Sequence, residues 1–312
     1  MSLSLLIPAG VLAAGGYLFQ HGQGQQATAA ERRLAGLQDI RQLRGLLETL
    51  PQHRGMANGL LQGDESFRAK LTELQARIDA DMRRLQEITA GGDPWAVAGR
   101  CGQIRRQWDS LKGGLQKLQP QESFARHSLL IQELLYLIND IGDGAGLLSH
   151  GGALAATIID RIPLVTEILG QARGMGTGAA THGRCDTAMR VKLQFLLHKA
   201  QTVSDQLKRE QGSTQGSKTG LRKNAQEATE NFLGLLRERI IEAPDISLSP
   251  SDYFSAGTQA IQHNFVLLDK LMEVLQSQLE ADLARERNRR TLSRAAAGLL
   301  LLPALWLARL AF

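Results

Sequence analysis

The sequence predicts an all-α protein of about eight helices, arranged as two similar four-helix bundles with an apolar helix at each end. Composition is the first observation: the 312 residues include only 8 Phe, 3 Tyr, 3 Trp and 8 Pro, which is poor in the residues that sheets favour. Periodicity is the second, because apolar residues recur at spacings of three and four, as in the run 37–50. Helix breaks rich in Gly, Pro, Asp and Ser are the third, at 62–65, 90–94, 119–123, 149–152, 211–220 and 243–251.

The first element is an uncharged stretch over residues 3–19, and we expect residues 1–20 to form a transmembrane anchor. A secretory signal peptide is the alternative, but the stretch has neither a basic start nor an obvious small-residue cleavage site. The last element, 294–312, is the second expected anchor. It is uncharged over 295–308, and Arg309 would have to reach the bilayer surface.

These anchors lead us to expect a protein of the bacterial cytoplasmic (inner) membrane whose domain is residues 21–290. Five arginines between 285 and 294 favour a cytoplasmic domain by the positive-inside rule. Two anchors around one large domain are instead typical of a periplasmic sensor, which is the side we expect. Cys101 and Cys185 could pair in an oxidising compartment, and the sequence leaves this open.

Charge is concentrated near the C-terminus. The chain has 36 Lys+Arg against 31 Asp+Glu. Removing the six arginines after position 284, and Glu286, leaves 30 basic and 30 acidic residues in 1–284. Because nucleic-acid binders carry their basic excess on the folded domain, this neutral body predicts no nucleic-acid partner.

An internal duplication underlies the two predicted bundles. The pattern Q-x-R-G-M-x-x-G occurs at 52–59 and again at 171–178, which is 119 residues later, and Glu48 matches Glu167 upstream. A weaker echo relates 124–132 to 254–262, 130 residues apart. We therefore expect two similar halves, about 26–149 and 151–290.

The repeated motif holds the candidate binding residues. Arg54 follows Leu50 by four residues and Arg173 follows Leu169 by four, so both arginines lie on apolar helix faces and point toward the core. Gly55 and Gly174 leave space for a helix or a small ligand. A buried guanidinium needs an anionic partner. Each arginine could pair with a carboxylate of a neighbouring helix, or both could converge on a planar oxyanion.

Four segments carry a resemblance to a known family: LPQHRGMANG at 50–59, ILGQARGMGTG at 168–178, ARHSLLIQELL at 125–135 and PSDYFSAGTQAIQ at 250–262. They resemble the nitrate- and nitrite-sensing (NIT) family and related helical sensor modules of bacterial chemoreceptors. The resemblance covers most of 26–290. It implies two four-helix bundles that bind nitrate or nitrite between them through arginines. Arg54 matches the family's Q-x-R-G signature, with His53 where Glu is more usual. Arg173 matches the later signature, and Arg126 is a looser match.

Enzymatic and metal chemistry find little support. The 212–219 stretch has the wrong spacing for a phosphate loop, the histidines show no metal-binding pattern, and we expect no enzyme activity, no cofactor and no metal.

Together these features predict a membrane-anchored sensor of a small oxyanion, nitrate or nitrite, that passes a conformational signal onward. Members of the family continue into an output module, whereas this sequence ends at Phe312. The expected partners are therefore the lipid bilayer and a separate membrane signalling protein or transporter reached through a final helix from Tyr253. The sequence leaves open a homodimer with a second copy. The alternative is a ligand-free helical scaffold that organises a membrane protein.

Overall fold

The computed structural model describes the backbone of residues 6–210 and 219–310 and the side chains of 26–209 and 220–296. The described residues form helices and no strands, which confirms the all-α class. The α-helices are α1 (Leu6–Leu61), α2 (Phe67–Ala90), α3 (Ala98–Gly114), α4 (Pro120–Gly144), α5 (Leu147–Ala156), α6 (Ile162–Thr181), α7 (Thr187–Glu210), α8 (Thr219–Leu236) and α9 (Pro250–Leu310).

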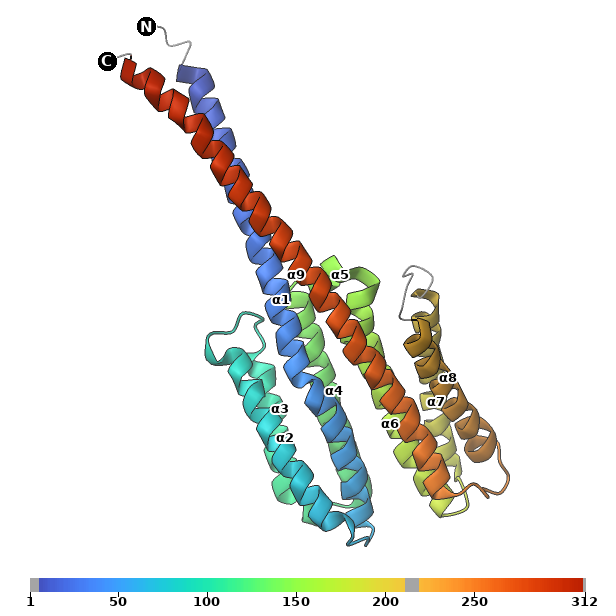
Figure 1. The fold of residues 1–312 in the computed structure, drawn as a ribbon. Helices are drawn as coiled ribbons and strands as arrows, with labels where there is room; N and C mark the ends of the chain where they lie inside the picture. Colours follow the sequence, from blue (N-terminus) through green and yellow to red (C-terminus); the bar gives the residue numbers. More distant parts are fainter. Residues whose placement is uncertain (1–5, 211–218, 311–312) are drawn as a thin grey trace.

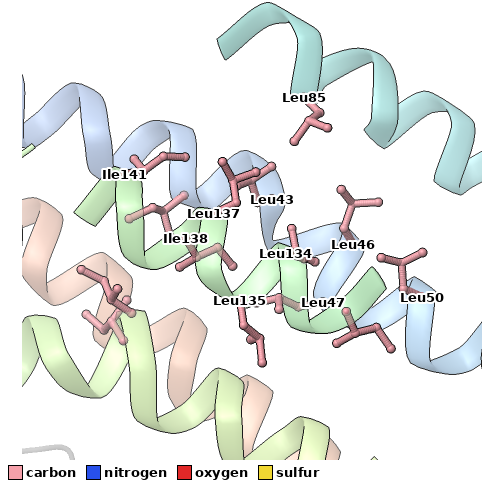
Figure 2. Packing of buried hydrophobic residues seen from close by; sticks show 14 of the residues in the cluster. Leu43, Leu46, Leu47, Leu50, Leu85, Leu134, Leu135, Leu137, Ile138 and Ile141 are labelled. Carbon is pink, nitrogen blue, oxygen red and sulfur yellow. The ribbon is translucent and has the colours of Figure 1, made fainter. Parts of the chain in front are cut away.

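The first half of the chain packs α1 against α2 and α4, with α3 beside α2 and α4 (Figure 1). Apolar residues spaced by three and four on α1 and α4 are fully buried here, and Figure 2 shows Leu43, Leu46, Leu134 and Ile138 among them. The apolar stripe predicted on 37–50 is thus the face of α1 that fills this core.

The second half repeats this arrangement with α6 against α7 and α9, and α8 against α9 and α7 (Figure 1). Phe232 of α8 and Tyr253 of α9 pack against each other in its core, with ring centroids 5.1 Å apart. A π-helical turn, Thr157–Arg161, joins α5 to α6, and Gly152 kinks α5 with a φ of 50°.

The terminal helices α1 and α9 pack against each other and join the two halves. Both helices extend beyond the bundles, side by side (Figure 1). Polar pairs cross between them, among them Arg44 to Asp269 at 2.9 Å and Arg287 to Glu31 at 2.8 Å. Helix α9 is continuous through Tyr253 and the arginine cluster.

The sequence predicts a membrane anchor at each end of the chain. Within the residues that the structure describes, no helix is both long enough and apolar enough to cross a membrane. Most of 1–20 and 294–312, the expected anchors, lies outside the residues whose side chains are described. The two anchors therefore stay predictions.

The two cysteines do not pair with each other. Cys101 is buried and free, and Cys185 is partly buried and free.

Candidate functional site

Arg54 lies at the boundary between the two halves, on the buried face of α1. Its guanidinium donates to both carboxylate oxygens of Glu167 on α6, at 2.5 Å and 3.1 Å, and to the Ser128 hydroxyl on α4 at 2.9 Å. The guanidinium also stacks on the Phe124 ring, 4.8 Å from its centroid. Only 2% of the Arg54 side chain and 7% of the Glu167 side chain are exposed. For Arg54, the pairing with a carboxylate of a neighbouring helix is therefore the one observed.

Arg173 lies on α6 and is also buried. Its guanidinium donates to the Thr258 hydroxyl at 2.8 Å and stacks on the Phe254 ring, 4.6 Å from the centroid. The buried Nε has no hydrogen-bond partner. Burial, together with the positive charge of Arg54, lowers the pKa of Arg173 to about 10, while Glu167 opposes the change. Arg173 is thus still charged at neutral pH, but its charge is incompletely compensated.

The two arginines have equivalent aromatic and hydroxyl neighbours. Phe124 and Ser128 of α4, which contact Arg54, are 130 residues before Phe254 and Thr258 of α9, which contact Arg173. This is the spacing of the weaker sequence echo. Each hydroxyl also donates to the backbone carbonyl of the phenylalanine one turn before it, at 2.9 Å in α4 and 2.8 Å in α9. The internal duplication therefore extends to the side chains around each guanidinium.

The carboxylates break this equivalence. Glu167 accepts hydrogen bonds from Arg54 of the other half and from Gln171 one turn on, at 2.6 Å. Its counterpart Glu48 accepts from Gln52 one turn on, at 3.3 Å, but its ion pair is with Arg44, at 3.0 Å. Arg173 consequently has no ion pair equivalent to the one between Arg54 and Glu167.

A cavity of about 50 Å³ lies beside Arg173, between α1, α6 and α9. A single water molecule needs roughly 10–15 Å³ of such space, so this cavity has room for a group larger than one water. Nitrate has four non-hydrogen atoms and nitrite has three. The lining comprises apolar and polar side chains of both halves: Leu47, Glu48, Pro51, Gln52, Thr166, Arg173, Thr258, Ile261, Gln262 and Phe265.

The other residues singled out in the sequence lie outside this lining. Gly55 is exposed, and a Cβ there would meet nothing within 4 Å. A Cβ on Gly174 would lie 3.2 Å from the Phe124 ring. Arg126 is exposed on α4 and pairs with Glu122, one turn before it, at 2.6 Å. The structure thus brings Arg54 and Arg173 to one boundary but leaves Arg126 on the surface.

A buried histidine pair adjoins Arg54, and sequence reasoning missed it. His53 Nδ1 lies 2.7 Å from His127 Nε2, and His53 packs edge-on against Trp108 with ring centroids 4.9 Å apart. Burial lowers the pKa of His53 to about 3 and that of His127 to about 4. The position after Gln52 therefore holds a neutral imidazole within the core of the first half.

Comparison with known proteins places this arrangement in a family. The family model for nitrate and nitrite sensing (NIT) matches residues 45–286, which include both repeated motifs and the cavity. The chain belongs to the NIT family. As a sensing family, NIT also supports the expectation of a regulatory protein and not an enzyme.

A solved structure described as "Structure of the NasR transcription antiterminator" resembles this NIT chain, with a TM-score of 0.63 and 17% identity. The match covers 92% of this chain and 82% of that one. At this identity the likeness establishes the fold. The search of curated proteins found no match.

The solved structure bears on two expectations. It is described as a transcription antiterminator, and the expected exclusion of nucleic acid stays a prediction for this chain. We correct the expected localisation, an inner-membrane protein with a periplasmic domain, because the similar solved structure is described as a transcription antiterminator and no described helix could cross a membrane.

Proposed function

We propose that this NIT chain senses nitrate or nitrite by binding the anion in the cavity between α1, α6 and α9, with Arg173 as the principal ligand. Three linked observations carry the proposal. Arg173 is a buried guanidinium with an unpartnered Nε, it lines a cavity sized for a small oxyanion, and the carboxylate equivalent to the partner of Arg54 is engaged elsewhere.

The chemistry of the cavity suits a planar anion. A guanidinium presents coplanar donors, and a planar oxyanion accepts two of them at once in charge-assisted hydrogen bonds. The low dielectric around a buried arginine strengthens this attraction. Thr258 and Phe254 fix the guanidinium, so little side-chain freedom is lost on binding.

Arg54 has a supporting role in this proposal. Its ion pair with Glu167 fastens α1 to α6 and so holds together the boundary at which Arg173 lies. Gly174 leaves room for the Phe124 ring on which Arg54 stacks. Gly55 and Arg126 are assigned no contact with the anion.

The cavity also offers a route for a signal. An anion held there would touch α1 from the first half and α6 and α9 from the second. It would therefore favour whichever relative arrangement of the halves fits it better. Helices α1 and α9 run together out of the bundles, so a shift between them would be carried along their length.

Thermal unfolding of the full chain tests the proposal. Nitrate or nitrite at about 100 times Kd should stabilise the protein by about 2.7 kcal/mol, which is roughly 4 °C in Tm. Chloride at equal ionic strength is the salt control. Arg173→Lys should lose most of the shift because lysine offers a point charge, whereas the matched change Arg126→Lys should keep it. Equal shifts with chloride, or an unchanged nitrate shift in Arg173→Lys, would contradict the proposal.

A further inference from the structure

Glu48 is the residue that could occupy the anion site from within the chain. It lines the cavity together with Arg173, and it stands 119 residues before Glu167, the carboxylate that neutralises the equivalent arginine. Both glutamates accept a hydrogen bond from the glutamine one turn on. If the halves were fully equivalent, Glu48 would pair with Arg173 across the boundary.

Arg44 prevents this pairing in the structure. It lies one turn before Glu48 on α1 and donates to Glu48 Oε2 at 3.0 Å. Its Nε and Nη2 donate to the Asp269 carboxylate of α9 at 2.9 Å and 3.3 Å, and its guanidinium stacks on Phe265, 3.9 Å from the ring centroid. Arg44 is therefore fixed on two sides, and it holds Glu48 with it.

The second half has no arginine equivalent to Arg44. The residue 119 positions after Arg44 is Pro163, which lies in the first turn of α6 and has no charge. No cation one turn before Glu167 competes for its carboxylate, and Glu167 reaches Arg54. The presence of arginine in one repeat and proline in the other thus accounts for the difference between the two carboxylates.

We infer that Glu48 is a built-in competitor of the sensed anion, and that Arg44, fixed by Asp269 and Phe265, is a positioning residue that holds Glu48 away from Arg173. This inference rests on the proposed function. It adds that the affinity of the site is set by a balance between two ion pairs, Arg44 with Glu48 and Arg173 with Glu48. Because Arg44 joins α1 to α9, a relative movement of these helices would alter that balance.

Anion affinity in single and double variants of the full chain provides the first test, with nitrate as the probe in isothermal titration. Glu48→Gln alone should raise affinity by no more than about fivefold, as for a partly exposed charge. Arg44→Met should weaken binding at least about tenfold, because the freed carboxylate takes the place of the anion. Adding Glu48→Gln to Arg44→Met should restore binding. Arg41→Met, on the same helix, is the control for loss of a positive charge.

Non-additive effects of Glu48→Gln and Arg44→Met on nitrate affinity distinguish competition by Glu48 from a general effect of charge. The gain from Glu48→Gln should be several times larger in the Arg44→Met background than in the parent. Equal gains in both backgrounds would overturn the inference, because Arg44 would then act only through its charge.

A second measurement requires no ligand, so it separates failure of this inference from failure of the proposed function. In the parent, the effects of Glu48→Gln and Arg173→Met on the folding equilibrium constant, measured by urea unfolding, should be independent, so their coupling factor should be near one. In the Arg44→Met background it should reach about tenfold in the folding equilibrium constant, as a new ion pair forms. Absence of coupling there would refute the competitor role even if nitrate binds, whereas coupling without nitrate binding would leave only the proposed function at fault.

Discussion

The buried pair between Arg54 and Glu167 should dominate the stability of the boundary between the two halves. Replacing Glu167 with Gln leaves the guanidinium, which is 2% exposed, without a compensating charge. Breaking such a pair from one side costs about 3–5 kcal/mol. For a chain of this size, this corresponds to a fall of roughly 5–8 °C in Tm. Arg54→Met should cost a similar amount, because it strands the carboxylate.

The double variant Arg54→Met/Glu167→Leu makes this prediction specific. Two apolar side chains of similar volume leave no buried charge, so most of the lost stability should return. Urea unfolding followed by circular dichroism would give the free energies of the parent, both single variants and the double variant. Single variants within about 0.5 kcal/mol of the parent would refute the reasoning, because that is the effect of an ordinary surface change. Arg126→Met, which removes an exposed partner of Glu122, serves as the surface control.

Two further predictions concern the cores of the two halves. His53 and His127 have pKa values lowered to about 3 and about 4, so only the unfolded chain binds their protons as pH falls below about 6.5. Stability should therefore be lost on acidification, with a limiting slope of about 1.4 kcal/mol per pH unit for each histidine, and a flat profile in urea unfolding between about pH 7 and pH 5 would contradict this. In the second half, Gly176→Ala would force a methyl group into the Tyr253 ring and should destabilise by about 1–3 kcal/mol. Gly178→Ala, where a Cβ meets nothing within 4 Å, should be neutral or stabilising in thermal unfolding, and similar losses in both variants would argue against close packing at Tyr253.

Most helix boundaries were readable because they depend on local chemistry. The break predicted at 119–123 contains Pro120, which begins α4, and the one at 243–251 contains Pro250, which begins α9. The break predicted at 149–152 is instead a kink within α5, because Gly152 takes a positive φ while the chain continues as a helix. The turn between α6 and α7 was missed, although Gly183, with a φ of 65°, marks it.

The site was predictable only in part, for the same reason. The inward direction of Arg54 and Arg173 follows from four-residue steps along single helices. Which carboxylate meets which arginine depends on contacts across the fold. Glu48 lies one turn from Arg44, so their pairing was open to sequence reasoning, but the anchoring of Arg44 by Asp269 spans 225 residues. No local pattern reports that contact.

The proposed function depends on the incomplete equivalence of the two halves. If both glutamates reached across, each buried guanidinium would be neutralised within the chain, and no electrostatic demand for an anion would remain. If neither did, two uncompensated buried cations would each cost several kcal/mol. One closed pair, Arg54 with Glu167, fastens the halves together, while Arg173 keeps a charge that an outside anion can satisfy. Of the two duplicated arginines, Arg54 therefore stabilises the boundary and Arg173 makes it dependent on ligand. Changes to Arg54 should act mainly on folding, and changes to Arg173 mainly on binding.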